Sequence, residues 1–378
     1  HIPFCRQACD YCNFHFSTRL NKKEEMIRTI AKEILSPPFL QKINNTQIET
    51  IYFGGGTPSL LTESELKMLL DAVHIHFNVS TTAEITLETN PDDHTEEKLN
   101  IWKAIGINRL SIGVQSFFEN DLMQMNRAHN AQQSIDCIKT AQDKGFHNLT
   151  IDLIYGIPGL TEERWKYNFE KARELDIPHL SCYALTVEPK TALNALIARG
   201  QSPPVNEEQQ ARQFLLLMNW AADAGFEHYE ISNFAKPGHR SRHNTAYWQG
   251  KPYFGFGPSA HSFDGNKTRW WNIANNALYM QSVNSHQSYF ETEILTPVQQ
   301  LNEYIMTALR TTEGINMMDA RWSMTSKPSF LLTARKWEKQ GKILITDEDI
   351  KLTNEGKLFA DGIAADLFIP SWKTEVGS

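Results

Sequence analysis

The chain has 378 residues, of which 41% are apolar and 21% charged, and its formal net charge at pH 7 is −7. This length predicts two domains, or one large domain with an appendage. The acidic balance argues against a nucleic-acid partner, and the sequence contains neither an apolar run long enough to cross a bilayer nor a visible signal peptide.

The chain starts with a cysteine-rich segment in which Cys5, Cys9 and Cys12 follow the spacing C-x3-C-x2-C. Three closely spaced thiolates suit a soft metal centre, and on a four-iron cluster they would leave one iron open for a substrate. The alternative is three unrelated thiols in a loop. Cysteines used in this way indicate a reducing compartment, so we expect a cytoplasmic protein. The residues before Cys5 read like the end of a strand, so we also expect the chain to be slightly truncated.

Predicted strands then alternate with predicted helices of about ten or more residues. The strands are expected at 47–53, 84–88, 109–114, 149–154, 179–186 and 226–231, and the helices at 21–35, 62–74, 95–104, 131–144, 162–175 and 207–224. This alternation predicts βαβ units and a parallel sheet. Six or seven units fall short of a closed barrel, so the expected fold class is α/β, a partial (β/α)6-type barrel with its chemistry at the carboxyl ends of the strands.

Polar residues and glycines follow four of these strands. The glycine-rich turn 54–58 comes after the first, and Glu88, Gln115 and Asp152 lie at the ends of three others. Each alone is explained equally well as a helix cap, a satisfied loop group or a tight turn. Because the carboxyl ends of parallel strands meet at one mouth, the four together predict a site there.

The chain resembles the radical SAM (S-adenosylmethionine) superfamily and, along nearly its full length, the oxygen-independent coproporphyrinogen III oxidases and their relatives. The motifs that carry this resemblance are His1-Ile-Pro-Phe-Cys5, Gly54-Gly-Gly-Thr-Pro58, Ser111-Ile-Gly-Val-Gln-Ser116, Asp152-Leu-Ile-Tyr-Gly156 and Tyr229-Glu-Ile-Ser-Asn233. The resemblance implies a [4Fe–4S] cluster held by Cys5, Cys9 and Cys12. It also implies that an electron from an external donor passes through the cluster and cleaves SAM to methionine and a 5′-deoxyadenosyl radical.

The same resemblance implies the residues that contact SAM. Tyr11 and Thr186 would lie against the adenine, Gly55, Gly56 and Thr57 would meet the amino group, Glu88, Gln115 and Asp152 would make polar contacts, and Arg127 would pair with the carboxylate. A surface arginine would look the same in sequence, so the role of Arg127 depends on the resemblance.

Two features resemble the HemW subgroup of haem chaperones more closely than the true oxidases. Phe14 stands where the oxidases have a fourth cysteine, and the segment from His243 to Trp248 matches H-N-x-x-Y-W, a signature associated with haem binding through His243, Tyr247 and Trp248. From its residues alone this segment reads as a structural loop, and whether His243 ligates iron stays open. His261 is a second candidate ligand.

The pattern changes from about residue 288. Helices at 297–310 and 328–340 are expected before a hairpin with the acidic turn 347–349 and a final helix, which together predict a small winged-helix-like module. Acid at the wing tip argues against DNA binding and favours a lid over the barrel mouth or a docking surface for a partner. We therefore expect three parts: a radical SAM partial barrel at 1–235, a connecting segment with the H-N-x-x-Y-W motif at 236–287, and the C-terminal winged-helix-like domain at 288–378.

The function favoured by these features is that of a haem chaperone, which binds haem and transfers it to an acceptor protein. The first alternative is an oxygen-independent coproporphyrinogen III oxidase of porphyrin biosynthesis, so whether the chain is an enzyme stays open. The second is a winged-helix regulator that senses iron or SAM. The expected partners are haem or a porphyrin, an acceptor protein that the sequence does not identify, and an electron donor for the cluster. No nucleic acid or membrane span is expected, and peripheral membrane contact is left open.

Overall fold

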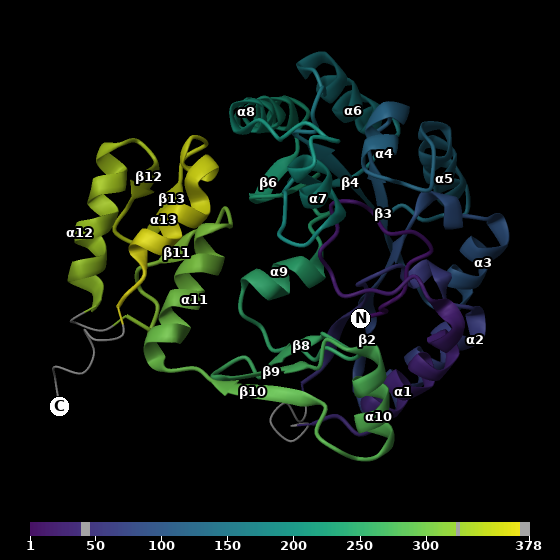
Figure 1. Cartoon of the computed structure of the whole chain (residues 1–378). Helices are drawn as coiled ribbons and strands as arrows, with labels where there is room; N and C mark the ends of the chain where they lie inside the picture. The colour runs from purple at the N-terminus through teal and green to yellow at the C-terminus, as the bar shows by residue number, and fades with distance from the viewer. Residues whose placement is uncertain (39–45, 323–325, 371–378) are drawn as a thin grey trace. The chain divides into compact units, whose positions relative to one another are not determined.

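The structure is a computed structural model that describes residues 1–38, 46–322 and 326–370 (Figure 1). The chain forms two compact units: the first comprises residues 1–213, 254–262 and 270–291, and the second comprises the remaining described residues. The expected division of the chain at residues 235 and 287 stays a prediction. Within the described residues, no helix combines the length and the apolar character that crossing a membrane requires.

A parallel sheet forms the centre of the first unit. Its strands are β1 (Ile48–Phe53), β2 (Val79–Thr89), β3 (Arg109–Gln115), β4 (Leu149–Tyr155) and β5 (His179–Ala184), which lie side by side in chain order. Each neighbouring pair is parallel, with Ile51 beside Ile85 and Leu110 beside Leu149. All seven residues of β3 are buried, as expected for a parallel strand covered on both faces. The predicted α/β fold with a partial barrel is confirmed.

Except for the short helix at 192–198, which lies beside the cysteine segment with its Leu193 amide donating to Asp10 O at 2.7 Å, the helices of the parallel units lie around the outside of these strands (Figure 1). In chain order they are α1 (Lys23–Leu35), α2 (Glu63–His76), α3 (Glu96–Ala104), α4 (Glu119–Gln124), α5 (Ala131–Asp143), α6 (Glu162–Glu174), α7 (Ala192–Ala198) and α8 (Glu207–Asp223). Polar caps set several of the starts: the Thr62 side chain accepts from the Glu65 amide at 3.3 Å, and the Glu65 side chain accepts from the Thr62 amide at 2.8 Å. This reciprocal pair satisfies two donors that a helix start leaves free.

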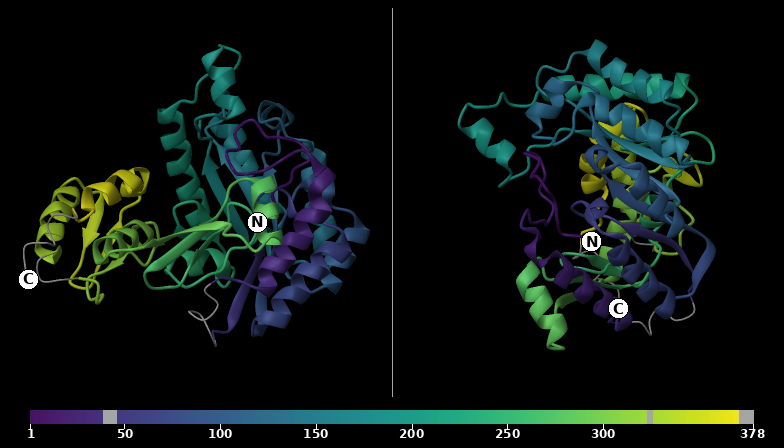
Figure 2. Two further views of the ribbon diagram at one scale, coloured as in Figure 1. Left: turned by 60° about the horizontal axis from the view of Figure 1, so that its bottom comes forward. Right: turned by 90° about the vertical axis from the view of Figure 1, so that its right-hand side faces the viewer.

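A buried carboxylate holds α1 to a distant part of the first unit. Glu33 accepts hydrogen bonds from Asn272 Nδ2 at 2.7 Å, from the Gly257 amide at 2.8 Å and from the Tyr279 hydroxyl. Tyr279 lies in α10 (Asn276–Asn284), which packs beside α1 (Figure 2). Because burial raises the pKa of Glu33 to about 7, these three donors are needed to offset the cost of placing a carboxylate there.

The N-terminal segment continues the sheet only as a short bridge. Ile2 pairs in parallel with Gly55, where the Ile2 amide donates to Gly54 O at 2.8 Å and the Gly56 amide donates to Ile2 O at 2.8 Å. The Thr57 amide donates to Phe4 O at 2.7 Å. The strand expected before Cys5 is therefore represented by this pairing, which anchors the cysteine segment beside the end of β1.

The second unit contains a hairpin that the sequence did not predict. The strand expected at 226–231 is present as β6 (Glu227–Glu230), and it pairs antiparallel with β7 (Asn233–Ala235). Two residues between the strands are enough for an antiparallel connection and too few for a parallel crossover. The H-N-x-x-Y-W motif, which the residues alone suggested to be a loop, forms the short helix α9 (Arg242–Trp248). Strands β8 (His261–Phe263), β9 (Thr268–Asn272) and β10 (Phe290–Ile294), whose residues are divided between the two units, form a further sheet with β9 in the middle.

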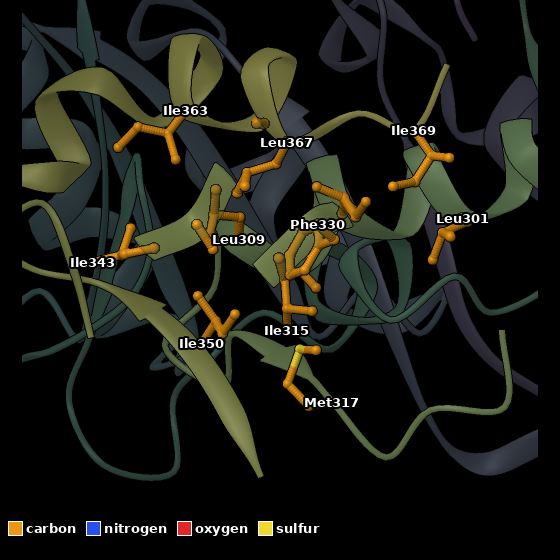
Figure 3. Packing of buried hydrophobic residues seen from close by; sticks show 14 of the residues in the cluster. Leu301, Leu309, Ile315, Met317, Phe330, Ile343, Ile350, Ile363, Leu367 and Ile369 are labelled. Carbon is orange, nitrogen blue, oxygen red and sulfur yellow. The ribbon is translucent and has the colours of Figure 1, made fainter. Parts of the chain in front are cut away.

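The C-terminal part of the second unit has its own hydrophobic core (Figure 3). It contains α11 (Pro297–Leu309), β11 (Ile315–Asn316), α12 (Ser326–Lys339), β12 (Ile343–Ile345), β13 (Asp349–Leu352) and α13 (Ala360–Leu367). The strands form a sheet in the order β11-β13-β12, so the expected hairpin around the acidic turn is confirmed. Phe330 of α12 and Ile363 of α13 lie in the core with Ile315 and Ile350 of the sheet, which makes this part a compact module.

Candidate functional site

A cavity of about 440 Å³ opens in the first unit at the carboxyl ends of the parallel strands. Its wall contains every residue predicted to hold the cluster or SAM: Cys5, Cys9, Tyr11, Cys12, Gly55, Gly56, Thr57, Glu88, Gln115, Arg127, Asp152 and Thr186. The structure thus brings together residues that are up to 181 positions apart, because the carboxyl ends of successive strands meet at this mouth.

The three N-terminal cysteines are free thiols on the cavity wall. The Cys12 amide donates to Cys9 O at 3.2 Å, so the last two thiols share one turn. Burial raises the pKa of Cys5 to about 11 and also raises that of Cys12, which favours the neutral thiols. A positively charged metal centre would offset this effect and stabilise the thiolates. In the described part of the chain, no three potential ligands converge on one point as a single ion would need. A four-iron cluster is several ångströms across and binds separated thiolates, so this donor set fits such a cluster with one iron free of protein ligands.

Arg127 lies between the cysteines and the strand ends. Its Nη1 donates to Cys9 Sγ at 3.1 Å, and its Nη2 donates to Asn90 Oδ1 at 2.7 Å and to Gly113 O at 2.9 Å. The buried Nε has no partner among the described residues. A guanidinium has five N–H donors in a planar fork, so Arg127 is held in place and retains donors for an anionic group such as a carboxylate.

Two carboxylates face the same cavity. Glu88 accepts from the Tyr52 hydroxyl at 2.7 Å and from the Gly55 amide at 3.1 Å. Burial raises the pKa of Glu88, and burial followed by the neighbouring Glu88 charge raises the pKa of Asp152 to about 7. Buried acids whose ionisation is disfavoured in this way attract a cationic ligand, because its charge would offset the cost of ionising them. The cavity thus offers a cationic donor at Arg127 and anionic acceptors at Glu88 and Asp152.

The backbone around the cavity explains two residue types. Gln115 has φ of +69° at the end of β3, a left-handed conformation that is costly for a residue with a side chain and is often retained at functional sites. A Cβ atom on Gly56 would stand 2.6 Å from Phe4 O and 2.8 Å from Ile2 O. Only glycine therefore lets the turn after β1 approach the segment that carries Cys5.

Several cavity residues were not predicted from the sequence. Ser111, Gly113 and Tyr183 line the wall, Tyr52 binds Glu88, and Asn90 binds Arg127. A signal existed for two of them: Ser111 and Gly113 precede Gln115 by four and two residues, and alternate residues of a strand share one face. The partners at positions 52 and 90 depend on side-chain packing, which has no such periodicity.

The H-N-x-x-Y-W helix lies in the second unit and carries an aromatic group. His243 and Tyr247 are four residues apart on α9, with ring centroids 5.4 Å apart, and Tyr247 stacks on Tyr253 at 4.3 Å. Burial lowers the pKa of His243 to about 4, so its imidazole is neutral at physiological pH. Tyr247 keeps 41% of its surface exposed. His261, the second candidate ligand, is exposed and stacks at 6.1 Å on Trp271.

The chain is similar to known proteins over most of its length. Residues 1–172 match the family model of the radical SAM superfamily. The heme chaperone HemW of Bacillus subtilis is 33% identical over 96% of both chains, and that of Escherichia coli is 34% identical over 69% of this chain and 68% of its own. A mitochondrial radical S-adenosyl methionine domain-containing protein of Danio rerio is 30% identical over 96% of this chain and 84% of its own.

A solved structure shares the fold. Coproporphyrinogen III oxidase (HemN) from Escherichia coli superposes with a TM-score of 0.84 over 97% of this chain and 88% of its own, at 22% identity. At this identity the likeness concerns the fold and leaves the reaction open.

Proposed function

This chain belongs to the HemW family of radical SAM proteins, and from that premise we propose that it is a haem chaperone, which binds haem and transfers it to an acceptor protein. Membership of the superfamily implies a [4Fe–4S] cluster and SAM as cofactors. The observation that carries the proposal for this chain is the helix α9, where a neutral imidazole at His243 stands beside the half-exposed ring of Tyr247. A neutral imidazole is a common ligand of haem iron, and flat aromatic faces pack against a porphyrin.

In the proposed cofactor site, Cys5, Cys9 and Cys12 hold the cluster. When bound, the cluster supplies one electron and an iron site for SAM. The retained donors of Arg127 would bind the SAM carboxylate, and its bonds to Asn90 and Gly113 keep the guanidinium oriented. Glu88 orients the Gly55 amide, and its charge together with that of Asp152 would attract the cationic SAM molecule.

In the proposed haem site, His243 ligates the iron, and Tyr247 and Trp248 contact the porphyrin. A histidine must be neutral to ligate, and the lowered pKa of His243 means that no proton has to be removed first at neutral pH. His261 is the second candidate, since its exposed ring is accessible to a ligand.

The second candidate function is oxidative decarboxylation of a porphyrinogen, which the fold shared with HemN favours. Phe14 argues against it. The true oxidases, as the resemblance implies, have a cysteine at this position, and Phe14 is a 69% exposed residue on the cavity wall. The acceptor protein, the electron donor and the cytoplasmic location stay predictions. A role of the C-terminal module in docking the acceptor is part of the chaperone proposal.

The experiment is an anaerobic haem titration of cluster-reconstituted protein, followed by the Soret band, on the wild type, His243→Ala and His261→Ala. The proposal expects saturable binding near one haem per chain that weakens in His243→Ala and is retained in His261→Ala. Weakening in His261→Ala alone would move the ligand to that residue. Absence of specific haem binding, together with formation of protoporphyrinogen at enzyme-like rates, would refute the chaperone function and support the oxidase function.

A further inference from the structure

A buried ionic group in the second unit is centred on Glu230, whose side chain is 1% exposed. One of its oxygens, Oε2, accepts from the Ser232 amide at 3.0 Å and from Asn233 Nδ2 at 2.6 Å, which closes the turn of the β6–β7 hairpin. The other, Oε1, lies 3.0 Å from both Nε and Nη2 of Arg310. Glu230 therefore fixes the turn and one edge of the Arg310 guanidinium at the same time.

Arg310 follows α11 and is also held by the C-terminal module. Its Nη1 donates to Asp361 Oδ1 at 3.0 Å, at the start of α13. Its carbonyl accepts from the Ile231 amide at 3.1 Å, and the Thr312 amide donates to Tyr229 O at 3.0 Å. The guanidinium thus has two carboxylate partners and a paired backbone on either side, so it has little freedom to move.

This guanidinium lies over the ring of Trp248, the last residue of α9, with 5.2 Å between Arg310 Cζ and the ring centroid. The buried Nε1 of Trp248 has no hydrogen-bond partner within the described ranges. The position of this side chain therefore depends on packing contacts of its ring. A guanidinium over an indole ring is the strongest common form of cation–π contact. Trp248 is held through its ring, and α9 is held through Trp248.

We propose that Arg310 is a positioning residue for haem binding: by holding the Trp248 ring it fixes the helix that carries His243 and Tyr247. This inference rests on the haem site proposed above. Because Arg310 and Asp361 belong to the C-terminal module, haem affinity is coupled to the packing of that module within the second unit. The module is a support for the haem helix, in addition to any role in docking an acceptor.

The test compares haem affinity and Soret position in matched variants of the full chain. Removing Arg310 alone would strand a buried carboxylate, so Glu230→Gln serves as the reference and Glu230→Gln/Arg310→Met as the test. We expect the test variant to bind haem about two- to thirtyfold more weakly than the reference, the range that a cation–π contact supports, with a shifted Soret band. Arg310→Lys keeps the charge but loses the planar fork, so it should fold and show an intermediate loss.

The matched control is Arg240→Met. Arg240 also lies over a ring, that of Tyr229, at 5.3 Å, and also pairs with two acids, Glu227 and Glu313, but the contacts described for its side chain do not include α9. Its loss should leave haem affinity and Soret position unchanged. In a Trp248→Leu background, removing Arg310 should weaken haem binding no further, since its effect passes through that ring.

The outcomes separate the two proposals. If the wild type does not bind haem, the proposed function fails and this inference fails with it. If the wild type binds haem and the Arg310 variants bind within twofold of their references, the function stands and the positioning role is refuted. An additive loss in the Trp248→Leu background would also refute it, because the effect would then reach haem by another route.

Discussion

Replacement of Gly56 by alanine tests how the cysteine segment is attached to the sheet. The added Cβ would lie 2.6 Å from Phe4 O and 2.8 Å from Ile2 O, both of them backbone atoms that cannot rotate away. To reach ordinary contact at 3.4 Å, the segment must move by about 0.8 Å. This shift strains the bonds from the amides of Gly56 and Thr57 to the segment, which are now 2.8 and 2.7 Å long.

The expected cost follows from these contacts. Overpacking against rigid atoms costs about 1–3 kcal/mol, and weakening two hydrogen bonds adds about 1 kcal/mol. A total of about 2–4 kcal/mol is less than the stability of most domains, so the chain should still fold. The N-terminal segment should detach in part, and Cys5, which directly follows Phe4, should lose its place on the cavity wall.

The measurements are iron and sulfide per chain after anaerobic reconstitution, the free energy of unfolding by chemical denaturation, and limited proteolysis of the cluster-free protein at its N-terminus. We expect lower iron content, lower stability and faster cleavage. The matched control is Gly362→Ala in α13, where an added Cβ meets nothing within 4 Å and alanine should stabilise the helix by about 0.5–1 kcal/mol. Full iron content and unchanged proteolysis in Gly56→Ala would show that close approach of this turn does not hold the cysteine segment.

Three other predictions follow from described contacts. Arg127→Met should weaken SAM binding about ten- to a hundredfold in equilibrium dialysis, because the charge-assisted pair between Arg127 and the SAM carboxylate is lost. Unchanged affinity would show that Arg127 does not contact SAM. The pKa of Asp152 is raised to about 7, so its carboxylate forms as the pH rises through that value. SAM affinity should therefore rise with pH, by at most about tenfold per pH unit below pH 7, and level off above it. Asp152→Asn should abolish this pH dependence, and a dependence that persists in the variant would contradict the prediction. Glu33→Leu removes the acceptor of three buried hydrogen bonds and should lower the free energy of unfolding by about 3–5 kcal/mol, whereas the matched Glu24→Leu on the exposed face of α1 should change it by less than about 0.5 kcal/mol.

Features encoded by neighbouring residues were predictable. The alternation of strands and helices depends on local periodicity, so the parallel sheet of the first unit and the acidic hairpin of the C-terminal module were both expected. The position of the site was expected for the same reason, since the carboxyl ends of parallel strands must meet. Glu88, Gln115 and Asp152 do line one cavity with the three cysteines.

The hairpin of β6 and β7 and the small sheet around β9 were not expected. Their strands are three to five residues long, too short for a periodicity to emerge. The helix α9 is similar: its seven residues are mostly polar or aromatic and carry no apolar stripe, and its start is set by Ser241, which accepts from the Asn244 amide at 3.2 Å.

The cysteine spacing, the alternation of strands with helices and the end of the sheet where the cavity opens follow from the residues, because spacing and periodicity are properties of neighbouring positions. The partners of each charge depend on the tertiary structure. Arg127 is paired with Asn90 and Cys9, and Arg310 with Glu230 and Trp248, through contacts between residues 37 to 118 positions apart. Such pairs depend on how whole elements pack against one another, and no local pattern of residues records that packing.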